Sequence, residues 1–402
     1  MKSRIFINIH YLEIGGAETS LIALLQALDH KRVDVDLFLN DHRGEMMAYI
    51  PTWVNVLPPC KAYTMIERPI KEVIKAGYIH IAFARLWAKI RFWLYACKKQ
   101  PIDGSAIFGY VGKYVTPLLP SLKHLGEYDL AISFVTPQNI VLDKVQAKKK
   151  ICWIHTDYTN IDVNTALELP IWSGYDHIVS ISKEVTQNFC QIFPTLHDKI
   201  IEIENILSPK FIRQQANSVP QPSDMLKLEN GYTLLTIGRY CAAKKLEEIP
   251  IICRMLTEKG LIVKWYIIGY GGNDEYIRRA IAEEGMEENV ILLGKRVNPY
   301  PYIKACDWYV QPSRYEGKSL VVREAQILGK PVIINSYPTS ASQMQNGIDG
   351  IIVPMDVDKC AEAMAMALTD ERQKKSIVNY LITHDYGNES EVEKIYSLVG
   401  LK

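Results

Sequence analysis

The sequence predicts an α/β protein with two doubly wound, Rossmann-like domains that face each other across a cleft. The chain has 402 residues, enough for two domains that each bury a core of their own. Short apolar, β-branched runs alternate with helical patterns, as in parallel sheets that helices cover on both faces. This alternation occurs twice, once on each side of a polar segment, and therefore predicts two sheets.

The expected strands form two sets. In the first half of the chain they are Arg4–His10, Val33–Leu39, Asp129–Val135, Lys150–His155, His177–Ser182 and Ile200–Ile203. In the second half they are Tyr232–Arg239, Val263–Gly269, Val290–Leu293, Asp307–Gln311, Pro331–Asn335 and Gly350–Val353. Open α/β sheets bind ligands beyond the carboxyl ends of their strands, so we expect the functional residues in the loops that follow.

The polar segment at 208–231 is rich in Pro, Gln, Ser and Asn and has no hydrophobic period. It is interpreted as a linker between a first domain at 1–207 and a second domain at 232–385. Residues 386–402 are expected to form a C-terminal helix that packs back on the first domain.

Composition argues against several classes of protein. The formal net charge is +1, so no general attraction for nucleic acid is expected. The eight cysteines contain no C-x-x-C pair, which indicates free thiols in a reducing compartment and no bound metal. The N-terminal MKSRIFINIHYLEIGG is interpreted as a first strand rather than a signal peptide. The sequence has no run of about 18 apolar residues, so no membrane span is predicted.

The segment from 61 to 100 departs from the alternating pattern. Bases greatly outnumber acids there, and large aromatic residues are interleaved with them. A basic, Trp-rich amphipathic helix is typical of proteins that bind the membrane interface. The alternative is a helix that covers the first sheet with its bases simply solvated, and both hypotheses stay open. The candidate membrane or acceptor residues are Arg85, Trp87, Lys89, Arg91 and Trp93.

The stretch SRYEGKSLVVREAQILGKPVI holds two glutamates, Glu316 and Glu324, eight positions apart. Gly317 permits a tight turn after the preceding strand, and Ser319 can cap the helix that follows. Glu316 is then expected in a loop and Glu324 in the helix. Backbone amides at this helix start are expected to point outward, toward phosphate or sugar oxygens. These amides belong to Lys318, Ser319 and Leu320.

The stretch TIGRYCAAKKLEE places Arg239 at a strand end and Lys244 five residues later. Two cations at a strand–helix junction suit a diphosphate, because they neutralise its charge without a metal. Taken alone, ordinary surface bases are the simpler interpretation, and Lys245 is expected to be solvated. The D-x-D at Asp34–Asp36 alternates with apolar residues inside a strand, so we expect it on the solvent face rather than at a metal site.

Three further loops are candidates. Gly15 and Gly16 stand between the first strand and the first helix, where glycine lets backbone approach phosphate or sugar. IIGYGGNDEYI, Ile267–Ile277, lacks the third glycine of a dinucleotide loop, which favours a packing role. His155 ends a strand that opens into the expected cleft, although a lone histidine is more often structural.

Together these stretches resemble the donor site of glycosyltransferase family 4, the retaining sugar-nucleotide transferases of GT-B fold. The resemblance is strong across the second domain, fair at Ile14–Leu28 and absent over Lys61–Leu125. It implies that Glu324 binds the ribose hydroxyls, while Glu316 and His155 contact the transferred sugar. After E-G this chain has K-S, where the family often has a bulky apolar residue followed by Gly or Pro.

The same resemblance implies the remaining roles. Arg239 and Lys244 are similar to the family's pyrophosphate clamp, Arg296 to the edge that holds the base, and Gly15-Gly16 to its first loop. The expected catalytic residues are Glu316, His155, Arg239 and Lys244. The expected donor-binding residues are Gly15, Gly16, Arg239, Lys244, Arg296, Glu316, Gly317, Lys318, Ser319, Leu320 and Glu324.

The resemblance thus implies a retaining, metal-independent hexosyltransferase without a cofactor. It would move a sugar from a nucleoside diphosphate sugar, UDP-linked in our interpretation, to a hydroxyl of a glycan or polyprenyl-linked oligosaccharide in capsule or exopolysaccharide synthesis. The expected location is the cytoplasm, on the inner face of the plasma membrane. A sugar-nucleotide epimerase of the same fold and a non-catalytic sugar-nucleotide-binding subunit remain as alternatives. The basic aromatic segment disfavours the first, and the intact cations and glutamates disfavour the second.

Overall fold

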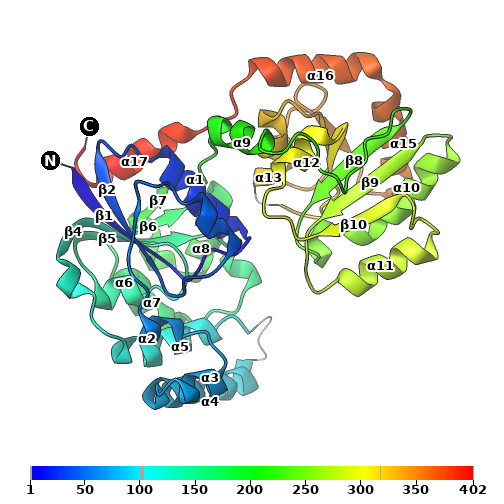
Figure 1. The fold of residues 1–402 in the computed structure, drawn as a ribbon. Helices are drawn as coiled ribbons and strands as arrows, with labels where there is room; N and C mark the ends of the chain where they lie inside the picture. The colour runs from blue at the N-terminus through cyan, green and yellow to red at the C-terminus, as the bar shows by residue number, and fades with distance from the viewer. Residues whose placement is uncertain (1, 100–103, 317, 402) are drawn as a thin grey trace. The chain divides into compact units, whose positions relative to one another are not determined.

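In the computed structural model the described residues are 2–99, 104–316 and 318–401. They fold into two compact units, drawn in Figure 1. The first unit comprises 1–206 together with 388–402, and the second comprises 207–387.

The first unit is built on a seven-stranded sheet with the order β3-β2-β1-β4-β5-β6-β7. All of its strand pairs are parallel. The strands are β1 Ser3–Ile9, β2 Val33–Leu39, β3 Asn55–Val56, β4 Glu127–Ser133, β5 Gln146–Ile154, β6 His177–Ser180 and β7 Ile200–Glu202. The two-residue edge strand β3 is too short to leave a period in the sequence.

The second unit has a six-stranded parallel sheet with the order β10-β9-β8-β11-β12-β13. The strands are β8 Tyr232–Ile237, β9 Val263–Ile268, β10 Val290–Gly294, β11 Trp308–Gln311, β12 Val332–Asn335 and β13 Ile351–Val353. Central strands such as β11 and β12 are buried along their whole length, because helices cover both faces of the sheet. The predicted α/β class with two doubly wound sheets is confirmed.

Helices connect the strands in both units. Those of the first unit are α1 Gly16–Ala27, α2 Lys61–Thr64, α3 Ile70–Lys75, α4 Ile79–Lys99, α5 Ile107–Val115, α6 Asn139–Lys144, α7 Thr165–Ser173, α8 Lys183–Ile192 and α17 Val392–Leu398. Those of the second unit are α9 Pro209–Ala216, α10 Ile249–Glu258, α11 Asp274–Glu283, α12 Tyr300–Ala305, α13 Leu320–Ile327, α14 Ser340–Gln343, α15 Val357–Thr369 and α16 Glu371–Thr383. None of the helices among the described residues combines the length and apolarity that a membrane span needs.

The segment interpreted as a linker, 208–231, differs from that expectation because it contains helix α9. The Ser208 hydroxyl caps this helix by accepting the Phe211 N–H at 3.3 Å, and a proline occupies the first turn. Ile212 and Ala216 are buried in the core of the second unit. The Ser-Pro pair therefore starts a helix here and does not mark a flexible link.

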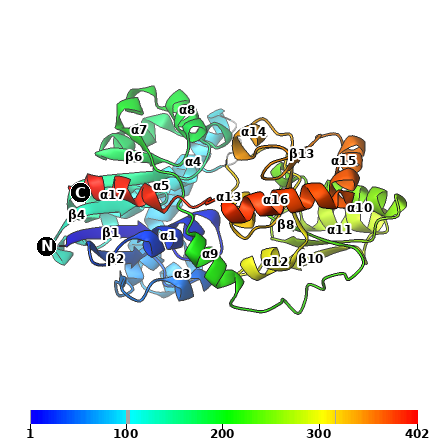
Figure 2. The ribbon, with the colours of Figure 1, turned by 90° about the horizontal axis from the view of Figure 1, so that it is seen from above.

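Helix α17 packs on the first unit, as Figure 2 shows. The Tyr396 hydroxyl accepts the Asp29 N–H at 2.6 Å. The Arg32 guanidinium lies 3.7 Å from the centre of the Tyr396 ring and pairs with Glu393 at 2.9 Å. The chain consequently passes from the first unit to the second and returns.

Candidate active site

The loops that follow β8 and β11 form the centre of the candidate site. These strands are hydrogen-bonded neighbours, and the sheet continues through β9 and β10 on one side and β12 and β13 on the other. Ligands bind at such a switch point in open α/β sheets, because neighbouring loops diverge there. The loop after β8 holds Arg239 and Lys244, and the loop after β11 holds Glu316.

Lys244 and Glu316, from different loops, form an ion pair. Lys244 Nζ lies 2.5 Å from Glu316 Oε1, and the two side chains are 21% and 11% exposed. The carbon chain of Lys244 crosses Gly238, where an added Cβ atom would lie 3.3 Å from Lys244 Cδ. The structure therefore brings together two of the predicted catalytic residues.

A buried chain of hydrogen bonds orients the Glu316 carboxylate. Glu316 Oε1 accepts from the Ser313 hydroxyl at 2.6 Å, and Ser313 Oγ accepts from Gln311 Nε2 at 2.9 Å. The Tyr309 hydroxyl donates to Gln311 Oε1, and Gln311 and Ser313 are fully buried. A satisfied polar network in a low-dielectric interior is rigid. Sequence reasoning assigned no role to Ser313, and its only signal is its spacing from Glu316.

Arg239 and Lys245, on either side of Lys244, differ in exposure. Arg239 is exposed and has no hydrogen bond or ion pair with the rest of the described chain. The expectation that Lys245 is solvated is wrong, because Lys245 is 6% exposed. Its Nζ donates to the Met355 carbonyl at 2.6 Å and pairs with Glu248 at 2.6 Å. The left-handed backbone of Lys245, with φ of +56°, gives its side chain a direction that sequence spacing does not reveal.

Arg314 joins the two loops of the site. Its backbone N–H donates to the Ala243 carbonyl at 2.8 Å, and its guanidinium donates to the Ala242 carbonyl at 2.5 Å. The guanidinium also pairs with Glu247 at 2.6 Å. Because these bonds connect the loop after β11 to the loop after β8, they hold the two loops at a fixed separation.

Glu324 lies in helix α13, as predicted, and is 4% exposed. Its Oε1 accepts a 2.9 Å hydrogen bond from the Tyr300 hydroxyl. Burial raises the pKa of Glu324 to about 7, while the Tyr300 hydrogen bond lowers it. A carboxyl group kept this far from water without a paired cation is costly to the fold. Such groups concentrate at functional sites.

The start of α13 differs from the expected set of outward amides. Ser319 holds the N-cap position, but its side chain makes no capping bond. Its N–H donates to Gln343 Oε1 at 2.8 Å, so this donor points into the protein. Lys318 is exposed and Leu320 is half-buried, while the prediction for Gly317 lies outside the described residues.

Arg296 is held by two acceptors in the second unit. Its Nη2 pairs with the Asp224 carboxylate, and its Nε donates to the Tyr302 hydroxyl at 2.9 Å. Tyr302 in turn donates to Asp224 at 2.9 Å. This triad fixes the guanidinium at the surface, where Arg296 is 31% exposed.

The glycines of Ile267–Ile277 serve close packing. An added Cβ at Gly269, where φ is +158°, would lie 1.9 Å from the Gly238 carbonyl oxygen. This loop therefore packs against the backbone at Gly238, which the Lys244 side chain crosses.

His155 lies in the first unit, just beyond β5. Its ring centre is 4.6 Å from that of Phe134, and its Nε2 atom is buried without a partner in the described chain. Burial lowers the pKa of His155 to about 4, while a hydrogen bond with the Phe134 backbone raises it. The imidazole is therefore neutral at pH 7.

Gly15 and Gly16 also belong to the first unit, at the start of α1. An added Cβ at Gly15 would lie 2.2 Å from the Glu18 carboxylate, whereas one at Gly16 would meet nothing. The Glu18 carboxylate is the end of a flexible side chain that can move, so the neighbours require glycine at neither position.

The aspartates of the D-x-D segment differ from each other. Asp34 is exposed and pairs with Lys2 at 2.9 Å. Asp36 is only 19% exposed and accepts from the Tyr128 hydroxyl at 2.6 Å. Within the described ranges, no cluster of His, Cys, Asp or Glu has the geometry of a metal site.

Helix α4 covers the first unit with one face, through Ile81, Ala82 and Ala88. Arg85 lies on this inward face and donates to the carbonyls of Met65, at 2.9 Å, and Arg68. Its membrane or acceptor role stays a prediction, while its guanidinium is bonded inside the protein. Sequence spacing alone did not reveal which of the bases on α4 is satisfied inside the protein.

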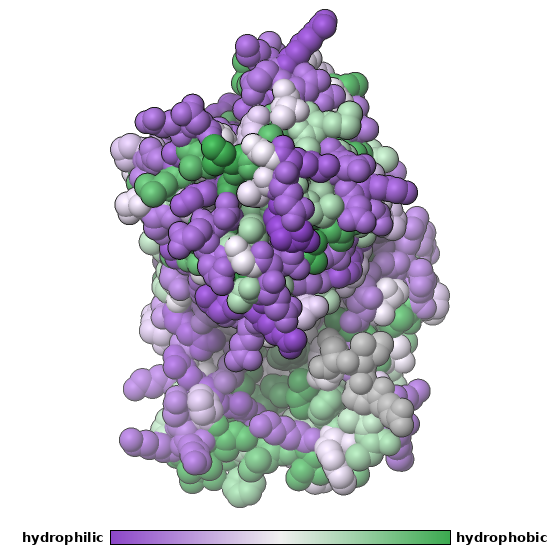
Figure 3. All heavy atoms as spheres, turned by 90° about the vertical axis from the view of Figure 1, so that its right-hand side faces the viewer, coloured by the Kyte–Doolittle hydropathy of each residue, from purple (hydrophilic) through white to green (hydrophobic). Residues whose placement is uncertain are grey.

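The opposite face of α4 is exposed and apolar. Trp87 is 50% exposed and Trp93 is 63% exposed. Lys89 and Arg91 are exposed and make no ion pair with the other described residues. The other large exposed apolar residues of this helix are Ile79, Phe83, Leu86, Ile90 and Leu94. Hydrophobic residues gather at the lower edge of Figure 3, the edge at which Figure 1 draws α4.

The comparison with known protein families gives a match in the second unit. Residues 221–383 match the family model described as "Glycosyl transferases group 1". These residues include Arg239, Lys244, Arg296, Glu316 and Glu324.

Two curated relatives are glycosyltransferases. One is the N-acetylgalactosamine-N,N'-diacetylbacillosaminyl-diphospho-undecaprenol 4-alpha-N-acetylgalactosaminyltransferase of Campylobacter jejuni, 22% identical over 380 residues, with 93% of this chain and 92% of the relative covered. The other is the UDP-Gal:alpha-D-GlcNAc-diphosphoundecaprenol alpha-1,3-galactosyltransferase of Escherichia coli, 31% identical over 147 residues, with 36% and 38% covered.

Solved structures share the fold over the whole chain. HepE of Anabaena, solved in complex with UDP, has a TM-score of 0.64 at 15% identity, with 100% of both chains covered. TarM of S. aureus, solved in complex with Fondaparinux, alpha-GlcNAc-glycerol and UDP, has a TM-score of 0.65 at 14% identity, with 99% of both chains covered. These matches confirm the predicted resemblance: residues 221–383 match the group 1 glycosyltransferase model, and the chain has the GT-B fold.

Proposed function

We propose that this protein is a retaining transferase that moves a hexose from a nucleoside diphosphate sugar to a hydroxyl of a polyprenyl-diphosphate-linked glycan. The observation that supports this most is at the switch point, where Lys244 pairs with Glu316 and the same loop after β8 carries the exposed Arg239. Cations placed there suit a diphosphate leaving group. UDP is the favoured nucleotide, since the E. coli relative uses UDP-Gal and HepE was solved with UDP.

The acceptor class rests on the named relatives. Both the Campylobacter and the E. coli enzymes act on sugars attached to diphospho-undecaprenol. The relative from Erwinia amylovora, 22% identical over 275 residues with 61% of this chain and 67% of the relative covered, is named for amylovoran biosynthesis. We therefore assign this chain to the assembly of a surface polysaccharide on a lipid carrier, at the inner face of the plasma membrane.

The roles of the charged residues follow from transition-state electrostatics. As the bond between the sugar and the diphosphate breaks, negative charge grows on the leaving phosphate oxygen. Lys244 and Arg239 stabilise that charge. The departing phosphate accepts the proton of the acceptor hydroxyl while the acceptor oxygen bonds to the anomeric carbon from the same face, which gives retention. Glu324 accepts hydrogen bonds from the ribose hydroxyls, and Glu316 orients the transferred sugar.

His155 acts as a neutral hydrogen-bonding group in this proposal. Its bond to the Phe134 backbone places the ring proton on Nδ1, so the buried Nε2 is an acceptor. A sugar hydroxyl would satisfy this otherwise unpaired atom. A positive imidazole is not required, because its pKa of about 4 keeps it neutral at pH 7.

A panel of sugar nucleotides tests this function. The protein is incubated with UDP- and GDP-linked hexoses and N-acetylhexosamines, with and without polyprenyl-diphosphate sugars, and released nucleotide is measured. We expect acceptor-dependent release that persists in EDTA. Loss of turnover in EDTA with recovery on adding a divalent ion would refute the metal-independent clamp. Epimerised donor without any acceptor would instead identify an epimerase.

We further propose that the exposed face of α4 binds the anionic membrane that carries the acceptor. Trp87 and Trp93 lie among exposed apolar residues, and Lys89 and Arg91 stand beside them without partners among the described residues. Aromatic and apolar side chains would settle at the headgroup level, with each nearby base attracted by about 1 kcal/mol.

Vesicle co-sedimentation tests the membrane face. Lys89→Glu with Arg91→Glu is expected to abolish binding to anionic vesicles at low salt while nucleotide affinity stays unchanged. The matched control reverses the charge of two exposed bases of the second unit, Lys359 and Lys375. It should bind anionic vesicles as the wild-type protein does. Binding that survives the α4 reversal, or that is equal on neutral vesicles, would contradict the proposal.

A further inference from the structure

We infer that Thr339 and Gln343 are positioning residues that hold the sugar-contacting loop in its working shape. This inference rests on the proposed function, because it concerns the loop that follows β11 and carries Glu316. Thr339 is the N-cap of the short helix α14, and Gln343 is its last residue. Neither was singled out by the sequence.

Three hydrogen bonds connect these side chains to the backbone of the loop, one at Glu316 in its middle and two at Ser319 at its end. The Thr339 hydroxyl donates to the Glu316 carbonyl at 2.6 Å. Gln343 Oε1 accepts the Ser319 N–H at 2.8 Å, and Gln343 Nε2 donates to the Ser319 carbonyl at 3.3 Å. Gln343 is 1% exposed and Ser319 is 6% exposed. The side-chain amide therefore replaces a backbone partner at the start of α13.

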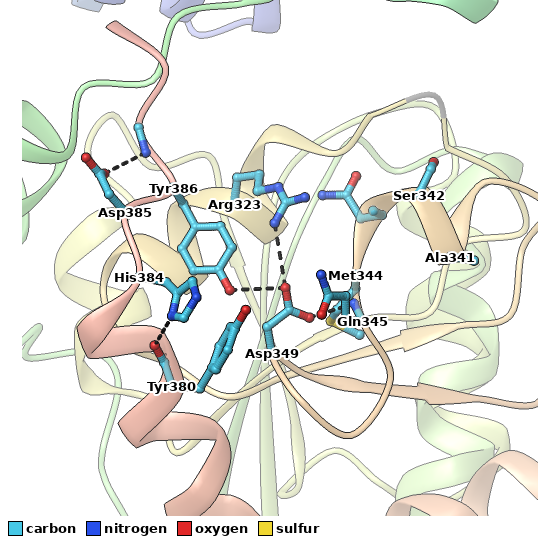
Figure 4. A pocket seen from close by; sticks show the side chains of 12 residues that line it. Arg323, Ala341, Ser342, Met344, Gln345, Asp349, Tyr380, His384, Asp385 and Tyr386 are labelled. Atoms are coloured by element: carbon cyan, nitrogen blue, oxygen red, sulfur yellow. Dashed lines mark hydrogen bonds and ion pairs between the residues drawn. The ribbon is translucent and has the colours of Figure 1, made fainter.

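Helix α14 is held by these bonds and by the buried residues that flank it, Tyr337 and Met344. A four-residue helix is not stable by itself, so its neighbours decide its position. Ala341, Ser342 and Gln343 border a pocket of about 390 Å³, shown in Figure 4. Arg323, Asp349 and Tyr386 line the opposite wall, where the Tyr386 hydroxyl donates to Asp349 at 3.0 Å. The two bonds to Ser319 therefore fix the side chain of a residue that borders open space.

The consequence for Glu316 is support from two directions. Ser313 fixes its carboxylate from the strand side, and Thr339 fixes its carbonyl from α14. Catalytic groups gain most when they are held in place before the substrate arrives. We therefore expect Thr339 and Gln343 to affect turnover more than nucleotide affinity. Arg239 and Glu324, which are proposed to bind the nucleotide, lie outside the loop that these two residues hold.

Matched substitutions test the positioning role of Thr339 and Gln343. Thr339→Val and Gln343→Met remove the hydrogen bonds while keeping the side-chain size, and each is expected to lower kcat by about 10- to 100-fold. The dissociation constant for UDP should change little, and the thermal midpoint should fall by only a few degrees, as expected when a buried N–H loses its partner. Thr339→Ser, which keeps the hydroxyl, should recover most of the turnover. Thr369→Val is the control, because it removes a similar hydroxyl–carbonyl bond on α15.

Hydrogen exchange supplies a readout that does not depend on activity. The Ser319 amide should be protected in the wild-type protein and exchange faster in Gln343→Met. Normal turnover despite lost protection, or a fall in kcat matched by equal losses in UDP affinity and thermal midpoint, would overturn the positioning role. A wild-type protein that turns over no sugar nucleotide would refute the proposed function. Unchanged protection of the Ser319 amide in Gln343→Met would instead refute the positioning role of Gln343.

Discussion

Lys244→Ala is expected to lower kcat by roughly two to three orders of magnitude, equivalent to about 2.7–4 kcal/mol of transition-state stabilisation. Lys244 Nζ and Glu316 Oε1 pair at 2.5 Å. In the reaction the ammonium group meets charge that grows on the leaving diphosphate, so its loss raises the barrier more than it weakens donor binding. Arg239→Ala should show a loss of the same kind.

The measurement is steady-state kinetics, with thermal unfolding as the check on the fold. Lys359→Ala, an exposed base on α15, is the control and should leave both unchanged. A kcat of Lys244→Ala within a few-fold of wild type would show that Lys244 does not stabilise the leaving diphosphate. A loss of activity that follows a loss of the folded protein would leave no role for the charge.

Glu324→Gln is expected to produce two effects of opposite sign. It should weaken UDP binding by about tenfold or more, because a buried acceptor for the ribose hydroxyls becomes a poorer one. It should also stabilise the ligand-free protein above pH 7, because the buried carboxyl no longer has to ionise. Functional residues commonly carry such a stability cost.

The pH dependence follows from the pKa of Glu324, which burial raises to about 7 from 4.5. Between these values the unfolded chain releases the proton while the native protein keeps it, so stability falls as pH rises. The full cost, about 3 kcal/mol, is present above pH 7 and absent below 4.5. Calorimetry at pH 4.5 and pH 8 should therefore show a gain in midpoint for Glu324→Gln only at pH 8. An equal gain at both pH values would show that ionisation of Glu324 is not the cause.

The strands were predictable because their signal is local. In parallel sheets covered on both faces the strands are near-continuous apolar runs, and each expected strand is present within a few residues of its predicted limits. The positions of Arg239, Lys244, Glu316 and Glu324 followed from the same signal, since the segments after adjacent parallel strands start at the same edge of the sheet. Only β3, two residues long, gave no pattern.

The missed features depend on contacts between distant segments. Lys245 turns inward because of one left-handed residue, and Arg85 is inward because Met65 and Arg68 offer carbonyls. The Ser319 amide is taken by Gln343, which stands 24 residues further along the chain. No pattern of charge or hydrophobicity near these residues reports such partners, so exposure and pairing had to come from the folded protein.

The most direct test of the central claim is to follow the anomeric carbon of the donor by NMR. The wild-type protein is incubated with a UDP-α-linked sugar and a polyprenyl-diphosphate-linked acceptor in EDTA, and the product linkage is read from the anomeric proton coupling. The account predicts an α-linked product together with free UDP, and no product from Lys244→Ala over the same time. A β-linked product, a requirement for a divalent ion, or UDP release and product formation unaffected by Lys244→Ala would contradict it.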